Sequence, residues 1–185
     1  MNYFNVQLDE GAMVAPTACL VGDVHIGADV TVMAGAAARG DYGGRVEVGA
    51  RSNLQENVCI HVDRNGGCFI GEGVTVGHGA ILHGCTIGDG CVVGMGSIVL
   101  DGARVGAHCL IGAGALVTGT ADIPEGMLVL GSPARVKRAL TPNEVERIAE
   151  GADEYLAIGC EMTAQGLLFT GDAVRKHCPQ VALKR

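Results

Sequence analysis

Two histidines at equivalent places in the chain are the first candidates for chemistry. His61 follows Ile60 and His83 follows Leu82, so each comes directly after an aliphatic residue. A third histidine, His78, stands between two glycines shortly before the second. Imidazole nitrogens are common zinc ligands, and three of them leave an open position for water, as in catalytic zinc sites. These histidines therefore predict a metal centre, provided that the fold can bring them together.

The strands and turns that must position these histidines are indicated by a sequence repeat of six residues. Between residues 87 and 123 an aliphatic residue recurs at every sixth position, often before a glycine, and a small residue follows four positions later. The aliphatic positions are Ile87, Val93, Val99, Val105, Ile111, Val117 and Ile123. Each hexad predicts one short strand and one turn, and three hexads predict one coil of a mainly β fold, a parallel β-helix.

Upstream the same frame continues with interruptions. The step between aliphatic positions lengthens from six to ten at residues 38–48 and again at 60–70, and it shortens to five at 82–87. The insertions carry turn residues, around 41–44 and 63–67, which predicts loops that leave the stack. Irregularity confined to one zone of a regular architecture is typical of a functional region.

Counting three hexads a coil places Arg39, His61 and His83 in one column, at a strand spacing of about 4.8 Å. Two histidines at that spacing can share one metal ion. Asp41 and Arg39 either form a simple loop ion pair or, as their place below His61 favours, a buried pair that supports the column.

His78 falls on another side of the triangular coil, roughly 17–20 Å away along a strand. We therefore expect it to reach the ion of a second stack packed alongside, and such a head-to-tail contact closes as a threefold trimer. Asn53 and Gln55 lie one hexad before the column. They either form a polar ladder or face the neighbour's metal and position its water.

Composition agrees with a narrow core and excludes other classes. The 185 residues include 30 glycines, only 3% are aromatic, and a hydrophobic share of 48% excludes intrinsic disorder. A net charge of −7 without a basic stripe disfavours nucleic-acid binding. The chain has no apolar run of about 18 residues and no signal-peptide pattern, so we expect a cytoplasmic protein that does not enter a membrane. The eight cysteines contain no C-x-x-C pair and are expected to be mostly small buried residues, not disulfides.

The frame ends after Pro124, and a helix is expected from Thr141. Thr141, Pro142 and Glu144 form the pattern of a capping box. The apolar face of this helix is expected to consist of Val145, Ile148, Ala149, Ala152 and Leu156 and to pack on the flank or end of the stack. We therefore expect two domains, a hexapeptide-repeat β-helix over residues 1–135 and a helical extension over 136–185 that packs on it.

Several segments together closely resemble the γ-class carbonic anhydrase family. They are residues 39–41 (Arg-Gly-Asp), 52–57 (Ser-Asn-Leu-Gln-Glu-Asn), His61, 77–85, 94–97 and 131–135. The resemblance covers roughly residues 12–158. It implies a left-handed β-helix, a homotrimer and one metal ion between each pair of subunits. His61 and His83 would come from one subunit and His78 from its neighbour.

The resemblance also implies a reaction. Zinc lowers the pKa of bound water to about 7, and the resulting hydroxide attacks CO2 to give bicarbonate. Arg39 and Asp41 resemble the family's inter-subunit ion pair, Gln55 the residue that orients the metal-bound hydroxide, and Asn53 a residue on the CO2 side. The expected ion is Zn2+, with Fe2+ or Co2+ as alternatives because three histidines and water suit all of them.

The chain departs from the family pattern at the residues that carry the proton of the metal-bound water to solvent. The prototype carries a glutamate after Arg-Gly-Asp, where this chain has Tyr42, and its second glutamate falls in a loop that here offers only Asp63. Val129 stands where many relatives have a tyrosine. Metal binding is expected to survive these changes, whereas fast proton export depends on Tyr42 or Asp63 as a replacement.

Two other functions stay open beside carbonic anhydrase. Relatives named for phenylacetate degradation and the carnitine operon share the scaffold, and a metal hydroxide can also attack a thioester, so an acyl-CoA thioesterase or acyltransferase is the alternative. Hexapeptide acyltransferases typically need one histidine as a base and not three converging ones. The last possibility is a non-catalytic trimer that keeps the metal as a structural staple.

Overall fold

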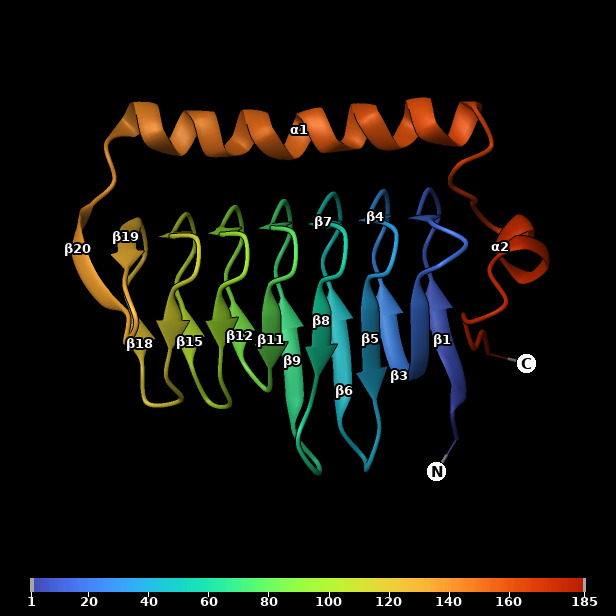
Figure 1. The fold of residues 1–185 in the computed structure, drawn as a ribbon, viewed down its shortest axis with the longest axis horizontal. Coiled ribbons are helices and arrows are strands. Elements are labelled where there is room, and N and C mark those ends of the chain that lie inside the picture. Colours follow the sequence, from blue (N-terminus) through green and yellow to red (C-terminus); the bar gives the residue numbers. More distant parts are fainter. Residues whose placement is uncertain (1, 185) are drawn as a thin grey trace.

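The computed structural model describes residues 2–184, and its main feature is a left-handed parallel β-helix with a helix along one flank (Figure 1). Two of its three faces belong to one sheet of 12 strands, and the third face is a sheet of 8 strands. Face 1 consists of β5 (Ala37–Gly40), β8 (Cys59–His61), β11 (Ile81–His83), β14 (Ile98–Val99) and β17 (Leu116–Val117). Face 2 consists of β6 (Arg45–Val48), β9 (Gly67–Ile70), β12 (Thr86–Ile87), β15 (Arg104–Val105) and β18 (Asp122–Ile123).

Face 3 consists of β2 (Met13–Val14), β4 (Thr31–Val32), β7 (Asn53–Leu54), β10 (Thr75–Val76), β13 (Val92–Val93), β16 (Leu110–Ile111), β19 (Met127–Leu130) and β20 (Arg135–Ala139). The longest strand, β3 (Cys19–Ile26), belongs to both faces 1 and 2 because it pairs with β5 through its first half and with β6 through its second. The first strand, β1 (Phe4–Leu8), pairs with β3 at the N-terminal end of the stack.

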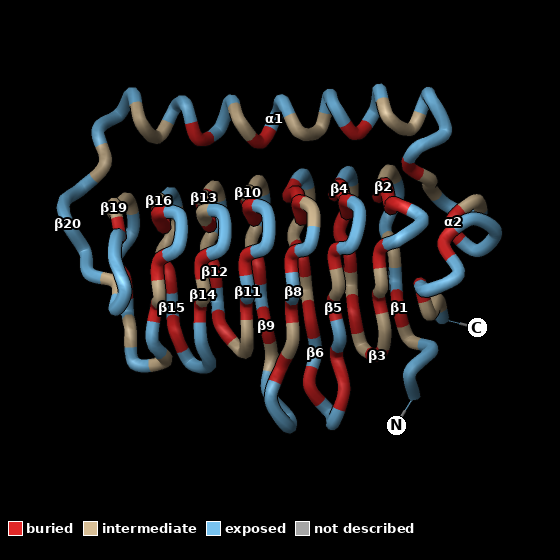
Figure 2. The backbone as a smooth tube through the Cα atoms, viewed as in Figure 1, coloured by how far each residue is buried: buried red, intermediate tan, exposed pale blue. Residues whose placement is uncertain are grey.

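The core is built from the aliphatic residue of each hexad, as the repeat predicts. Val93, Val99 and Ile111 are fully buried, and buried residues recur from coil to coil along the stack (Figure 2). Burying a side chain of this size stabilises the fold by roughly 1.5–3 kcal/mol. All eight cysteines are free and five of them are buried, so they act as small core residues.

The corners between faces 1 and 2 carry the irregularities of the repeat. The connections after β5 and after β8 are loops that extend beyond the stack (Figure 1), and they contain the two insertions. The connection from β11 to β12 is the shortest, because only Gly84 and Cys85 separate the two strands. The uneven corners therefore occur in the coils that carry Arg39, His61 and His83.

The C-terminal helix α1 (Pro142–Ala164) lies along face 3 and contacts β2, β4 and β7. Its start is the expected capping box: the Glu144 amide donates to the Thr141 hydroxyl, and the Thr141 amide donates to the Glu144 carboxylate. Such a cap is worth about 1 kcal/mol. Ile148 and Ala152 are buried as expected. Ala149 is exposed, because the part of the helix that meets the sheet is a narrower stripe than the spacing predicted.

Both ends of the stack differ from the simple repeat. The pairing does not stop at Pro124: β19 continues face 3 in parallel register with β16, and β20 then turns back antiparallel to β19. At the other end, α2 (Asp172–His177) and the residues after it close the first coil, with isolated bridges from Val181 to Leu20 and from Leu183 to Val6. No helix within residues 2–184 is long and apolar enough to cross a membrane.

Candidate functional site

The parallel register places three of the predicted residues in one column on face 1. Arg39 of β5 pairs with His61 of β8, and His61 pairs with His83 of β11. The two imidazole rings meet edge to face with their centroids 4.9 Å apart. The column that the hexad count predicts is therefore present in the fold.

Two carboxylates bracket this pair of rings along the stack. Asp41, in the loop after β5, accepts a hydrogen bond from Nε2 of His61 at 3.1 Å and pairs with the Arg39 guanidinium. On the opposite side, Asp101 accepts from Nδ1 of His83, with its two oxygens at 2.7 and 2.8 Å. Arg39, Asp41, His61, His83 and Asp101 are called the paired-histidine half-site below.

The carboxylate of Asp41 is nearly inaccessible to solvent, with 2% of its side chain exposed. Burial alone raises the pKa of this carboxyl, but the hydrogen bonds and charges of His61 and Arg39 outweigh it, so its pKa lies below the ordinary value. Asp41 is therefore a permanent acceptor at neutral pH. The buried pair that the sequence favours is buried only on the side of Asp41, because the side chain of Arg39 is 50% exposed.

The hydrogen bonds fix where each ring keeps its proton. A carboxylate only accepts, so Nε2 of His61 and Nδ1 of His83 carry the hydrogens, and in a neutral imidazole the other nitrogen then has a lone pair. Those other nitrogens, Nδ1 of His61 and Nε2 of His83, face each other at 2.9 Å. Two lone pairs at this distance repel unless a proton or a metal cation lies between them. The donor set therefore fits a divalent metal ion, whose histidine ligands commonly have a carboxylate behind them.

The other predicted residues gather around face 3. Gln55 is buried: its side-chain amide donates to Oδ1 of Asn53 at 3.3 Å, and its Oε1 accepts from the backbone N–H of His78 at 3.2 Å. Nδ1 of His78 lies 2.7 Å from Oε2 of Glu56, an ion-pair contact without hydrogen-bond geometry. Asn53, Gln55, Glu56 and His78 are called the single-histidine half-site below.

One chain does not bring the two half-sites together. His78 lies in the turn that precedes β11, and His83 ends β11, so the two histidines stand at opposite ends of this strand. Within residues 2–184 of one chain, no group of three or more His, Cys, Asp or Glu side chains is arranged to hold a metal ion.

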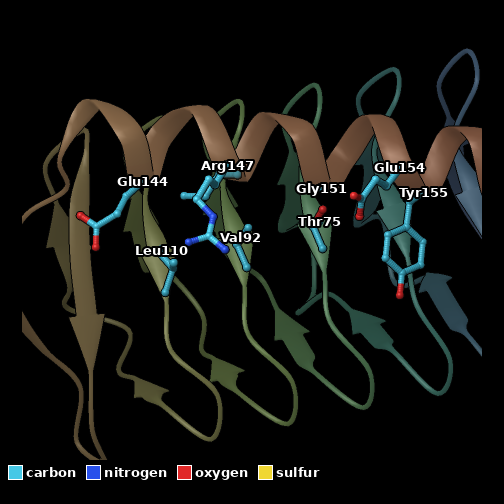
Figure 3. Close-up of a pocket in the computed structure, with 9 residues that line it drawn as sticks. Thr75, Val92, Leu110, Glu144, Arg147, Gly151, Glu154 and Tyr155 are labelled. Atoms are coloured by element: carbon cyan, nitrogen blue, oxygen red, sulfur yellow. The ribbon is translucent and has the colours of Figure 1, made fainter.

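The single-histidine half-site opens onto a groove on face 3. This groove has a volume of about 400 Å3 and is lined by Gln55, His78 and Met95 together with small and aliphatic residues of β13 and β16. A second groove of about 310 Å3 lies between α1 and the same face (Figure 3). Thr75, Val92 and Leu110 line both grooves, so an apolar trough continues from beneath α1 to His78.

The two candidate proton acceptors lie in the loops next to the paired histidines. Tyr42 follows Asp41 in the loop after β5 and is 46% exposed. The guanidinium of Arg64, in the loop after β8, lies 5.6 Å from the centre of the Tyr42 ring. Asp63 is in the same loop as Arg64 and accepts from the Arg64 amide. Both candidates therefore stand at the solvent end of the half-site.

Sequence reasoning missed two residues of these half-sites, Glu56 and Asp101. Glu56 stands beside Gln55, in the segment 52–57 that the sequence analysis had selected. Its contact with His78 could therefore have been predicted together with that of Gln55. Asp101 lies 18 residues after His83. Only its place one coil further along the stack could have indicated the contact.

The hexapeptide pattern is recognised independently of the fold. Residues 67–100 and 84–119 match the family model described as bacterial transferase hexapeptide (six repeats). A solved structure of a hexapeptide transferase family protein from Anaplasma phagocytophilum is 36% identical and superposes with a TM-score of 0.80, covering 84% of this chain and 92% of that one.

Curated relatives identify a narrower family within the hexapeptide-repeat proteins. A carbonic anhydrase of Geobacillus kaustophilus is 36% identical, and the alignment covers 94% of both proteins. Gamma carbonic anhydrase 1, a mitochondrial protein of Arabidopsis thaliana, is 41% identical over 84% of this chain but only 59% of its own length, so the chain spans less than two thirds of that relative. The chain therefore belongs to the γ-carbonic anhydrase-like family of hexapeptide-repeat proteins.

Proposed function

We propose that the protein is a metal-dependent carbonic anhydrase that interconverts CO2 and bicarbonate. His61 and His83 of one subunit and the neighbouring subunit's His78 would hold the ion, taken as Zn2+ with Fe2+ or Co2+ as alternatives. The observation that carries the proposal is the pair of facing imidazole nitrogens of His61 and His83, 2.9 Å apart, with Asp41 and Asp101 on the outer ring nitrogens. When bound, such an ion supplies Lewis acidity that lowers the pKa of a coordinated water to about 7.

The residues of this chain would supply binding and orientation. Asp41 holds the His61 ring in one tautomer, and Arg39 keeps Asp41 ionised. Gln55 is fixed at both ends of its amide, by Asn53 and by the His78 backbone, so its position follows that of His78. An amide held in this way can orient a water or an oxyanion at no further entropic cost.

Proton export would use a side chain in the loops beside His61. Tyr42 and Asp63 are the candidates, since they stand where the half-site meets solvent. Tyr42→Phe and Asp63→Asn separate them: the variant that loses turnover in dilute buffer, and regains it with added imidazole, identifies the residue that carries the proton. If neither variant responds to buffer, export does not pass through these side chains.

The proposal requires a homotrimer, because each half-site is incomplete alone. The groove beside His78 on face 3 is the surface expected to receive the paired-histidine half-site of the next copy. Successive head-to-tail contacts of this kind close around a threefold axis on a three-sided prism.

A second candidate is an acyl-CoA thioesterase or acyltransferase. The apolar trough from α1 to His78 favours it, since an acyl chain could lie there. The solved structure from Anaplasma phagocytophilum is also described as a hexapeptide transferase family protein. A trimer that holds the metal as a structural staple without turnover is the remaining alternative.

The deciding experiment is stopped-flow CO2 hydration on protein purified anaerobically, with metal content determined on the same sample. Hydration that follows the bound metal and disappears in His78→Ala supports the proposal. Stoichiometric metal without hydration contradicts it, and acyl-CoA hydrolysis is then the next assay. A trimer that binds metal and turns over neither substrate is the structural staple.

A further inference from the structure

Asp101 is an exposed carboxylate, yet it is aimed at a single ring nitrogen. Its side chain is 50% exposed, and both oxygens lie within 2.8 Å of Nδ1 of His83. It comes from the corner between β14 and β15, one coil further along the stack than His83. The contact is therefore made across coils and not within a local turn.

The backbone around Asp101 leaves room for this reach. Gly84, directly after His83, has φ +56°, and a Cβ at this position would lie 2.1 Å from Oδ1 of Asp101. A Cβ at Gly119, one coil further on, would lie 2.1 Å from the Asp101 carbonyl oxygen. The carboxylate thus passes over a residue without a side chain, in the corner that the five-residue step shortens.

The Asp101 contact mirrors that of Asp41 on the other side of the pair. Asp41 fixes the proton of His61 on Nε2, and Asp101 fixes that of His83 on Nδ1. Without Asp101 the His83 ring would be free to place its proton on Nε2, the nitrogen that faces His61. A ring in that tautomer has no lone pair to offer at the proposed metal position.

We propose that Asp101 is a positioning residue that holds His83 in its metal-binding tautomer and orientation. The inference rests on the proposed metal site, and it adds to it a residue outside the segments that carry the family resemblance. Loss of such an outer carboxylate typically weakens metal affinity 10–100-fold.

The test measures Zn2+ affinity by competition with a chromophoric chelator, for the wild type, Asp101→Ala and Asp101→Asn. Asp89→Ala is the matched control, since Asp89 is also a turn residue but its carboxylate accepts from the Glu72 amide and not from a histidine ring. We expect a 10–100-fold loss in Asp101→Ala, a smaller loss in Asp101→Asn, whose amide oxygen can still accept, and a change within about twofold in Asp89→Ala.

A second readout follows the tautomer itself. In metal-free protein labelled with 15N in histidine, long-range 15N–1H spectra should report His83 as the Nδ1–H form, and Asp101→Ala should add the Nε2–H form. Thermal unfolding midpoints check that both variants fold. The inference is overturned if Asp101→Ala has the same Zn2+ affinity as Asp89→Ala and its His83 tautomer is unchanged.

The two proposals fail in distinguishable ways. Wild-type protein that binds Zn2+ in an Asp101-dependent manner but hydrates no CO2 supports this inference and contradicts the carbonic anhydrase function. Wild-type protein that hydrates CO2, together with an Asp101→Ala variant of unchanged Zn2+ affinity, supports the carbonic anhydrase function and contradicts this inference. Wild-type protein that binds none of Zn2+, Fe2+ and Co2+ overturns both.

Discussion

At the scale of single residues, each histidine of the candidate site has a carboxylate on one ring nitrogen. The partners are Asp41 for His61, Glu56 for His78 and Asp101 for His83. In every case one nitrogen is left without a carboxylate. For His61 and His83 the contact is a hydrogen bond, which determines the nitrogen that can bind an ion, whereas for His78 it is an ion-pair contact without hydrogen-bond geometry.

Gln55 provides a residue-scale prediction. Gln55→Leu leaves the Asn53 amide oxygen and the His78 backbone N–H without their partner in a buried place, which should lower the free energy of unfolding by about 1–3 kcal/mol. Metal content should stay the same because no ligand to the ion is removed, whereas CO2 hydration per bound metal should fall because the orienting amide is lost. Urea unfolding and stopped-flow assays on one preparation measure both effects. Gln165→Leu at the exposed end of α1 is the control, and equal behaviour of the two variants would contradict a role for Gln55.

At the scale of elements, the corners and the helix decide how the repeat is used. The hexads alone would build a uniform prism, whereas the long loops after β5 and β8 and the short corner after β11 place Asp41 and Asp101 on either side of the two histidines. Helix α1 meets the stack tightly only along its contacts with β2, β4 and β7, and farther towards its start the groove of Figure 3 opens.

Two glycines of α1 test how closely it packs. A Cβ at Gly159 would lie 2.3 Å from Cγ2 of Thr31, whereas a Cβ at Gly151 would meet nothing within 4 Å. Gly151→Ala should therefore stabilise the protein by roughly 0.5–1 kcal/mol through helix propensity. Gly159→Ala should destabilise it, because overpacking costs about 1–3 kcal/mol and exceeds that gain. Chemical unfolding of both variants measures the difference, and a stabilised Gly159→Ala would mean that α1 does not pack as described.

The capping box of α1 should make stability depend on pH. Hydrogen bonds from Arg138 and from Thr141 lower the pKa of Glu144 to about 2. This is below the value of about 4.3 in an unfolded chain, so the contribution is complete above about pH 4.3 and disappears as the pH falls towards 2. Glu144→Gln should lower the unfolding temperature at pH 7, and the difference from wild type should shrink below pH 4. Glu146→Gln, two residues further along α1, is the control, and equal behaviour of the two variants would contradict a role for the capping box.

At the scale of the whole molecule, the candidate site consists of two halves on different faces of the stack. The paired histidines lie at the edge of face 1, and His78 lies at the edge of face 3. Neither half holds three ligands, so the proposed chemistry depends on assembly. The mass of one chain is 18.9 kDa, and the proposed particle has three times that mass.

Subunit mixing tests the divided site. His78→Ala and His61→Ala should each be inactive alone, because every site in either trimer lacks one ligand. Coexpression of the two variants should restore activity, since His61→Ala copies supply His78 to His78→Ala copies. With random assembly, about a quarter of the sites are complete. Light scattering checks that the mixture is trimeric. A trimeric mixture with no activity above that of its parents would contradict a site shared between subunits.

The sequence by itself determined the repeat, and with it the strands, the aliphatic core and the column of Arg39, His61 and His83. These follow from counting three hexads per coil, also across the two insertions, because each hexad repeats the same local geometry and residues one coil apart must stack. The capping box at Thr141 could also be predicted from the sequence, because its pattern lies within four consecutive residues.

Only the tertiary structure decided which carboxylate reaches which ring. Asp101 contacts His83 because Gly84 and a shortened corner bring the next coil close, and spacing within the sequence does not encode that approach. The extra strand pairing after Pro124 and the narrow buried stripe of α1 also depend on packing between distant segments. The six-residue period determines the backbone shape of each coil. Side-chain contacts between coils depend instead on the lengths of the corners and on the space left where a corner residue is glycine.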